Sequence, residues 1–171
     1  GMMDKHFVMY DDVMRVPLTM RWPGTIPAGR TSDEFVANAV DLPATFCEVA
    51  GADVPDRFQG TGLIDAACGT GGTGREDIFS TYHGNQFGGY DQRMVRDRRW
   101  KYVWNMTDVD ELYDLETDPG ELTNRLNDPA AADELTRLRG RLVAWMEDID
   151  DPMLNRWTGP LLEEEGRQVW G

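Results

Sequence analysis

The fold of this chain is constrained most by four strand-like segments that follow one another without a helical segment between them. They span residues 77–82, 92–96, 100–104 and 111–115. A short charged turn separates the second segment from the third, as in a hairpin, and Asp118-Pro119-Gly120 closes the series with a turn sequence. Parallel neighbours need long crossover connections, so strands this close together predict a small antiparallel sheet.

A long amphipathic helix is predicted after the sheet. Asp128 is a suitable N-cap, Pro129 suits the first helical position, and Asp151-Pro152 marks the end. Apolar residues recur at steps of three and four: Leu135, Leu138, Leu142, Trp145 or Met146, and Ile149. We expect this stripe to cover the sheet, which predicts an α+β fold.

Two further elements are predicted before the sheet. Residues 15–22 alternate well enough for a strand, which Pro23-Gly24 ends as a turn. Residues 41–51 predict a short helix with Asp41 as N-cap and Gly51 as its C-terminal stop. Its expected buried face carries Leu42, Phe46, Val49 and Ala50. Residues 52–76 then predict a flexible, glycine-rich connector that contains Cys68.

The charge excludes some classes of partner. The chain carries 31 acidic and 17 basic side chains, a formal net charge of −14, which argues against nucleic acids and anionic membranes. No stretch approaches the ~20 apolar residues of a membrane span, and no signal peptide is recognised. Two cysteines are too few for a disulfide framework, and Cys47 is interpreted as a small buried hydrophobe. The compartment stays open.

A basic cluster stands out in this acidic chain: Arg93, Arg96, Arg98, Arg99 and Lys101. It suits either an anion-binding platform or the solvent face of a hairpin whose other face buries Trp100, Tyr102 and Trp104. The alternation over 100–104 favours the solvent face, with some arginines paired to Asp110, Glu111 or Asp114. The carboxylates between 108 and 118 lack the spacing of an EF-hand loop, so no metal site is predicted there.

Several stretches carry a family resemblance. They are residues 1–6 (Gly-Met-Met-Asp-Lys-His), 10–24, 93–105 and 110–124. Over about residues 1–150 the chain resembles the C-terminal part of the sulfatases, in the alkaline-phosphatase-like superfamily. The resemblance implies a remnant of the large α/β catalytic domain over 1–60 and the C-terminal sheet-and-helix subdomain over 75–152. A tail, 153–171, contains Trp157 and Trp170, which we expect to dock.

The resemblance also implies site residues and cofactors. Lys5 matches the family lysine that contacts the sulfate ester, where a fixed ammonium stabilises developing negative charge. A complete family member uses calcium and a formylglycine residue. This chain contains neither the Cys-x-Pro-x-Arg or Ser-x-Pro-x-Arg sequence that becomes formylglycine nor the metal-binding Asp-His pair. We therefore expect no metal ligand in it, no cofactor, and no activity in isolation.

A second group of residues is implied to bind substrate. His83, Asn85 and Gln86 lie in a polar, glycine-rich segment between two strands, a position that commonly carries recognition groups. The resemblance implies that they contact the part of the substrate that is not the sulfate. The alternative interpretation is a hairpin loop whose polar groups satisfy its own backbone.

Three functions remain open from the sequence. The first is part of a sulfatase whose sulfate ester substrate is bound only by the complete enzyme. The second is part of a phosphonate or phosphodiester hydrolase of the same superfamily. The third is a stand-alone, non-catalytic domain that forms homo-oligomers through an exposed domain interface.

Overall fold

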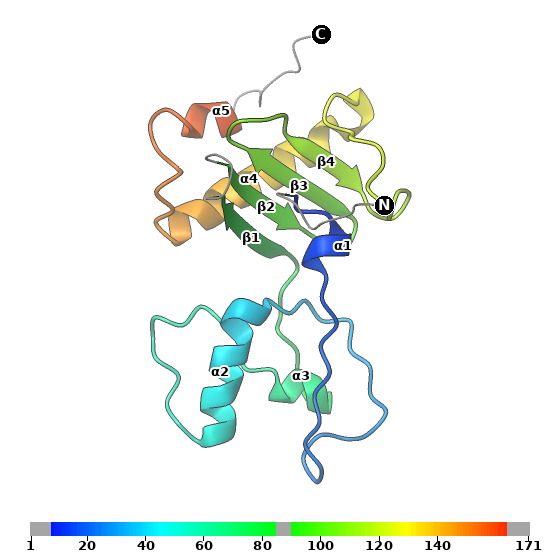
Figure 1. The fold of residues 1–171 in the computed structure, drawn as a ribbon, viewed down its shortest axis with the longest axis vertical. Helices are drawn as coiled ribbons and strands as arrows, with labels where there is room; N and C mark the ends of the chain where they lie inside the picture. Colours follow the sequence, from blue (N-terminus) through cyan, green and yellow to red (C-terminus); the bar gives the residue numbers. More distant parts are fainter. Residues whose placement is uncertain (1–7, 85–89, 164–171) are drawn as a thin grey trace. The chain divides into compact units, whose positions relative to one another are not determined.

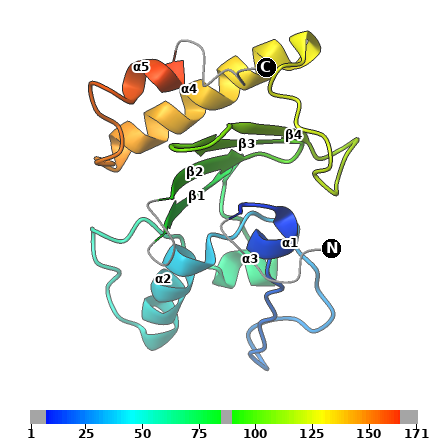
Figure 2. The same ribbon diagram turned by 45° about the horizontal axis from the view of Figure 1, so that its top comes forward.

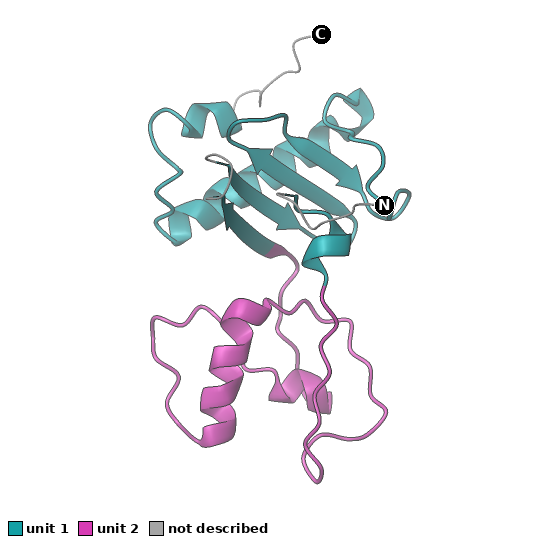
Figure 3. Ribbon diagram, viewed as in Figure 1, with its two compact units in different colours: residues 1–15, 79–171 teal, residues 16–78 magenta. Residues whose placement is uncertain are grey.

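The structure is a computed structural model that describes residues 8–84 and 90–163 (Figure 1). Its contacts divide the chain into two compact units (Figure 3). Unit 1 comprises residues 1–15 and 79–171, and unit 2 comprises residues 16–78. The domain boundaries expected from the family resemblance remain predictions.

Unit 1 is built on a four-stranded sheet in the order β1-β2-β3-β4. The strands are β1 (Ile78–His83), β2 (Asp91–Arg96), β3 (Trp100–Asn105) and β4 (Glu111–Asp114). β3 pairs antiparallel with both β2 and β4, and Gln92 lies opposite Asn105 in the register. The antiparallel sheet predicted from closely spaced strands is confirmed.

One face of the sheet is covered by the long helix α4 (Ala132–Asp148), which continues from the short 3-10 turn η1 (Pro129–Ala131) (Figure 2). Asp128 caps this start, since its side chain accepts a hydrogen bond of 2.9 Å from the backbone N–H of Ala130. The predicted stripe is confirmed, because Leu138, Leu142 and Met146 are completely buried. They form the main core with Trp100, Tyr102, Trp104 and Leu112.

The opposite face is covered by the N-terminal segment that contains the short helix α1 (Asp11–Met14) (Figure 2). Met9 packs there against Met94 and Val103 in a second, smaller core. Every residue of β3 is consequently buried. The prediction of a solvent face is therefore wrong for Lys101, because alternation indicates an open face only where no other segment covers it. It is also wrong for Arg93, which lies opposite Trp104 in the register, on the face that α4 covers.

The two buried cations of this sheet are paired with carboxylates from distant segments. Arg93 forms two hydrogen bonds to Asp151, of 2.5 and 2.9 Å. Lys101 Nζ donates to the backbone oxygen of Met9 at 3.0 Å, to Asp11 at 2.5 Å and to Glu121 at 2.6 Å. Such pairing is what makes burial of a charge tolerable.

The pair between Arg99 and Asp114 leads to a pH prediction. Arg99 donates to both oxygens of Asp114, at 3.0 and 2.9 Å, and this lowers the pKa of Asp114 to about 2. Because the folded pKa lies below the unfolded value of about 4, the contribution to stability is present above pH ~4 and is lost as the pH falls towards ~2. Urea unfolding between pH 2 and 5 should show about 1 kcal/mol of this loss, since water screens the half-exposed guanidinium of Arg99, and the loss should be absent in Asp114→Asn. Glu116→Gln, at a side chain that is 69% exposed, should leave the slope unchanged.

Unit 2 contains the helices α2 (Asn38–Ala50) and α3 (Ile64–Cys68). The predicted end of α2 is confirmed, because Gly51 adopts a left-handed conformation with φ of 65°. Its start is three residues earlier than predicted, and Asp41 is not the N-cap. Asp41 nevertheless accepts the N–H of Ala37 at 2.7 Å from inside the first turn. The predicted connector is interrupted by α3, and Cys68 ends that helix.

The buried face of α2 differs from the predicted one. Phe46 and Val49 are 66% and 46% exposed, whereas Asp41, Ala44 and Thr45 are buried. Asp41 receives two hydrogen bonds of 2.7 Å from Arg75 and one of 2.9 Å from the N–H of Thr61. The polar side of α2 is buried because residues 61–75 satisfy it with hydrogen bonds. Cys47 is only partly buried.

The strand predicted over residues 15–22 is wrong for this chain, since the segment is irregular beyond Arg15. A strand exists only when a neighbouring strand satisfies its backbone groups. The described residues of unit 2 contain no strand that could pair with it. Val16 and Leu18 are accordingly 56% and 44% exposed.

Candidate functional site

The predicted site residue that the structure describes, His83, ends strand β1. Its Nδ1 lies 2.5 Å from Oδ1 of Asp91, the first residue of β2. The side chain of His83 is 60% exposed and that of Asp91 is 24% exposed. A carboxylate on one ring nitrogen fixes the orientation of an imidazole and directs the other nitrogen, Nε2, away from the pair. The pair is therefore suited to presenting one oriented nitrogen to a ligand.

The buried pair between Arg93 and Asp151 lies close to this histidine. Burial alone raises the pKa of Asp151, but hydrogen bonds from Arg93 and from the N–H of Met153, with the charges of Arg93 and His83, lower it below its ordinary value. Asp151 thus stays charged and neutralises Arg93. The interaction also holds the end of α4 to β2.

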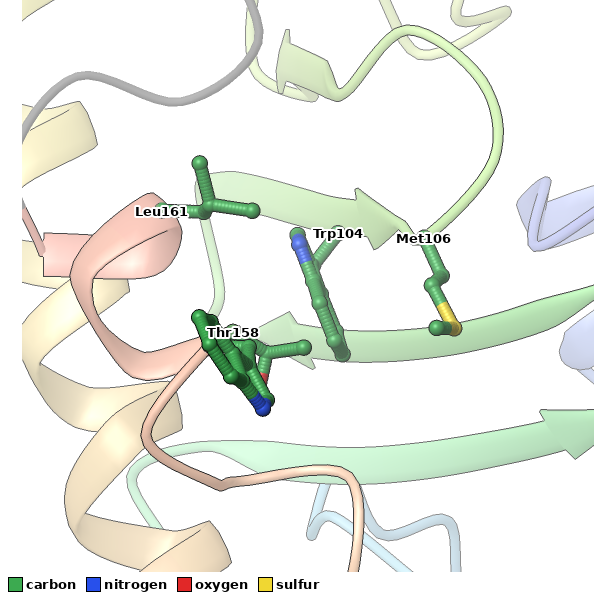
Figure 4. Close-up of a pocket in the computed structure, with 5 residues that line it drawn as sticks. Trp104, Met106, Thr158 and Leu161 are labelled. Carbon is green, nitrogen blue, oxygen red and sulfur yellow. The ribbon is translucent and has the colours of Figure 1, made fainter.

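A hollow of about 130 Å³ lies beside the end of β3 (Figure 4). Its lining residues are Trp104, Met106, Trp157, Thr158 and Leu161. Trp104 is 4% exposed, whereas Trp157 is 71% exposed. The guanidinium of Arg156 lies 4.6 Å from the centre of the Trp157 ring. The sequence signal for this feature was the tryptophan in the tail. Trp157 precedes the short helix α5 (Gly159–Glu163), whose Leu162 is buried in the main core.

The other predicted site residues, Lys5, Asn85 and Gln86, lie outside the described residues. The segment that follows Lys5 is described from residue 8 onwards. Lys101, Arg96 and Glu121 hold it through hydrogen bonds to Met9 and Asp11. Glu121 accepts the N–H of Asp11 at 2.6 Å, and Arg96 donates to both carboxylate oxygens of Asp11. Burial raises the pKa of Asp11, but the bonds from Lys101 and Arg96 bring it below its ordinary value. Sequence reasoning missed this anchor because it placed Lys101 in solvent.

The described residues do not fit a metal centre. Across 8–84 and 90–163, no group of three or more His, Cys, Asp or Glu side chains is placed to hold an ion. The free cysteines, Cys47 and Cys68, are both partly buried, and the sulfur of Cys68 contacts the backbone oxygen of Thr25 at 3.4 Å. No chemical step is therefore assigned to calcium or to a modified cysteine in this part of the chain.

Comparison with known families identifies the class to which this arrangement belongs. The family described as N-sulphoglucosamine sulphohydrolase, C-terminal, matches residues 1–148. The chain therefore belongs to the sulfatase family, in the alkaline-phosphatase-like superfamily. It corresponds to the C-terminal region of that family.

Individual relatives agree with this assignment. The chain is 27% identical over 175 residues to the uncharacterized sulfatase YidJ of Escherichia coli (strain K12), covering 99% of this chain and 34% of that protein. It is 34% identical over 131 residues to an N-acetylglucosamine-6-O-sulfatase of Bacteroides thetaiotaomicron, covering 72% and 23% respectively. The chain thus spans about a third or less of the length of these two relatives.

A solved structure shows the same fold. It is BT4656 in complex with its substrate D-glucosamine-2-N,6-O-disulfate, which superposes with a TM-score of 0.69 at 26% identity. The superposition covers 77% of this chain and 28% of that one. Among the helices of the described residues, none combines the length and the apolar character needed to cross a membrane.

Proposed function

We propose that this chain forms the C-terminal part of a sulfuric ester hydrolase that acts on a sulfated saccharide. The observation that carries the proposal is the family match over residues 1–148, which includes both Lys5 and the C-terminal sheet. The relatives named above include an N-acetylglucosamine-6-O-sulfatase and a structure that holds a sulfated glucosamine. These names support a saccharide as the part of the substrate that carries the sulfate.

Lys5 is proposed as the residue that contacts the sulfate. Sulfate ester cleavage develops negative charge on the oxygen of the leaving group, and a lysine ammonium held in place stabilises that charge in the transition state. The anchor of Met9 and Asp11 by Lys101 supports this role, because it begins four residues after Lys5. A complete family member uses formylglycine as its nucleophile and calcium as its metal. No described residue of this chain is proposed to supply that nucleophile or to bind that metal.

His83, Asn85 and Gln86 are proposed to bind the saccharide. The support for His83 is the short contact with Asp91, which leaves Nε2 to donate to or accept from a sugar hydroxyl. For Asn85 and Gln86 the support is their place in the segment that follows His83.

The test is an activity assay on the product of the complete gene. The sequence upstream of this segment should first be determined and the longer product expressed. We expect hydrolysis of 4-methylumbelliferyl sulfate and of N-acetylglucosamine 6-sulfate. Hydrolysis of a phosphonate monoester at a higher kcat/KM than either sulfate would contradict the proposal.

Two variants of that longer product separate the proposed roles. Lys5→Ala should lower kcat for sulfate esters by about a hundredfold, since removing one fixed donor from a charge-stabilising site has this effect. His83→Gln should chiefly raise KM for the sulfated sugar. Its turnover of 4-methylumbelliferyl sulfate should stay close to that of the unmodified enzyme. Equal loss in the two variants on both substrates would contradict the division of roles.

Self-association is the alternative that a specific observation supports. The exposed apolar side chains Phe46 and Val49 of α2 suit a homo-oligomer interface. Light scattering on the purified chain tests it, with Phe46→Ser expected to dissociate an oligomer formed through this helix. A monomer at all concentrations would reject it.

A further inference from the structure

We propose that the hollow beside the His83–Asp91 pair is a binding site for one ring of a sulfated saccharide, with the exposed face of Trp157 and the guanidinium of Arg156 as its recognition groups. The inference deepens the proposed function and rests on it for the choice of ligand. Its geometry comes from unit 1 alone.

The register of the sheet joins the hollow to His83. Because Gln92 lies opposite Asn105, Asp91 lies opposite Met106. The N–H of Met106 donates to the backbone oxygen of Asp91 at 3.0 Å. Asp91 in turn holds His83, while Met106 lines the hollow. A ligand in the hollow is thus one strand away from the proposed saccharide contact.

The lining is mainly apolar and includes two tryptophan side chains, of which Trp157 is exposed. Trp104 and Met106 come from the end of β3 and its continuation, and Thr158 and Leu161 come from the segment after α4 (Figure 4). Aromatic side chains offer a flat apolar face, which suits the C–H-rich face of a pyranose. The volume of about 130 Å³ is below the ~300–1,000 Å³ of drug-sized ligand sites, so it suits a single ring.

The charges around the hollow select an anionic substituent. Asp151 is neutralised by Arg93, and Asp91 is in contact with His83. The Cζ atom of Arg156 lies over the Trp157 ring, 4.6 Å from its centre, within the range of a cation–π contact. A guanidinium carries five N–H donors, so such a contact leaves donors for other partners. Those donors match the paired oxygens of an oxyanion. A neutral sugar would use the indole face alone, whereas a sulfated sugar uses both groups.

The experiment measures saccharide binding by the 171-residue chain itself, through tryptophan fluorescence and calorimetry. The probes are a sulfated tetrasaccharide prepared from heparin and its chemically desulfated counterpart. We expect tighter binding of the sulfated probe and a loss of about tenfold or more in Trp157→Ala, as for an aromatic hot spot. Arg156→Gln should bind both probes about equally, because it lacks the charge-assisted contact.

The chain offers a matched control in unit 2. Arg21-Trp22 repeats the dipeptide Arg156-Trp157, and Trp22 is 39% exposed. Arg21→Gln and Trp22→Ala should therefore leave the affinity for both probes unchanged. Equal losses in the two sets of variants would overturn the proposal, because binding would then follow any exposed tryptophan.

Other results would also overturn it. They are the absence of sulfated-probe binding by the folded chain, equal affinity of the unmodified chain for both probes, or a dimer that Trp157→Ala dissociates, which would make a second copy the occupant. The result of this binding experiment can be distinguished from the result of the sulfatase assay. Binding by this chain with no hydrolysis by the longer product would reject the proposed function alone, and the reverse result would reject the hollow alone.

Discussion

Replacing Lys101 with methionine is expected to lower the free energy of unfolding of unit 1 by about 3–5 kcal/mol, the usual cost of breaking a buried ion pair from one side. Lys101 is completely buried, and its ammonium contacts Asp11, Glu121 and the backbone oxygen of Met9. Methionine keeps the apolar length of the side chain but leaves two carboxylates without their shared cation. Urea unfolding followed by fluorescence measures the loss.

Arg137→Met is the matched control for Lys101→Met. Arg137 also contacts two carboxylates, those of Asp97 and Glu134, but its side chain is 44% exposed. Water screens such a pair, so its loss should cost less than about 1 kcal/mol. Similar losses in the two variants would show that Lys101 is not an internal anchor.

The same variant has a local consequence for the segment that carries Lys5. Hydrogen exchange at the N–H of Asp11, which Glu121 accepts, should accelerate in Lys101→Met more than exchange in α4 does. If exchange at the N–H of Asp11 were unchanged, Lys101 would stabilise unit 1 without holding this segment in place.

Asp41→Ala is expected to destabilise unit 2 by about 3 kcal/mol or more, because it leaves several buried donors without an acceptor. The Asp41 carboxylate accepts from the N–H groups of Ala37 and Thr61 and from both terminal nitrogens of Arg75. Site-resolved hydrogen exchange is the suitable measurement, since it reports the opening of α2 independently of the sheet in unit 1.

Asp65→Ala controls for loss of a carboxylate from the same unit. Asp65 is exposed, and its side chain accepts from the hydroxyl of Thr70 at 2.8 Å. We expect a change of less than about 1 kcal/mol, as for most surface substitutions. A loss from Asp41→Ala no greater than that from Asp65→Ala would contradict the role of Asp41 as the centre of unit 2.

The helix α2 shows why a local pattern can indicate the wrong face. Its apolar residues share one side, which predicts burial of Phe46 and Val49. The structure instead buries Asp41 and Thr45, because Arg75 and the N–H groups of residues 61 and 63 satisfy their polar atoms. Hydrogen bonds to residues 18 to 34 positions away are invisible to a periodicity that compares neighbours.

The candidate site, like the helix α2, was only partly predictable from the sequence. His83 was found because it lies in a polar segment at a strand end, and its carboxylate partner came only with the pairing of β1 and β2. Trp157 was expected to dock, but its side chain is 71% exposed and only lines the hollow. Its approach to Trp104 and Met106 depends on the path of the chain after α4, for which the sequence carries no periodic signal.

The sequence by itself determined the four-stranded antiparallel sheet, the helix α4 and its buried stripe, and the family, because these depend on short connections, regular spacing and local motifs. Only the tertiary structure decided that β3 is buried on both faces and that residues 15–22 do not form a strand. It also decided that Lys101 and Arg93 are internal cations. Each of these outcomes depends on what a distant segment supplies, whether a covering surface, a pairing strand or a carboxylate. A residue's own neighbours in the sequence carry no record of that partner.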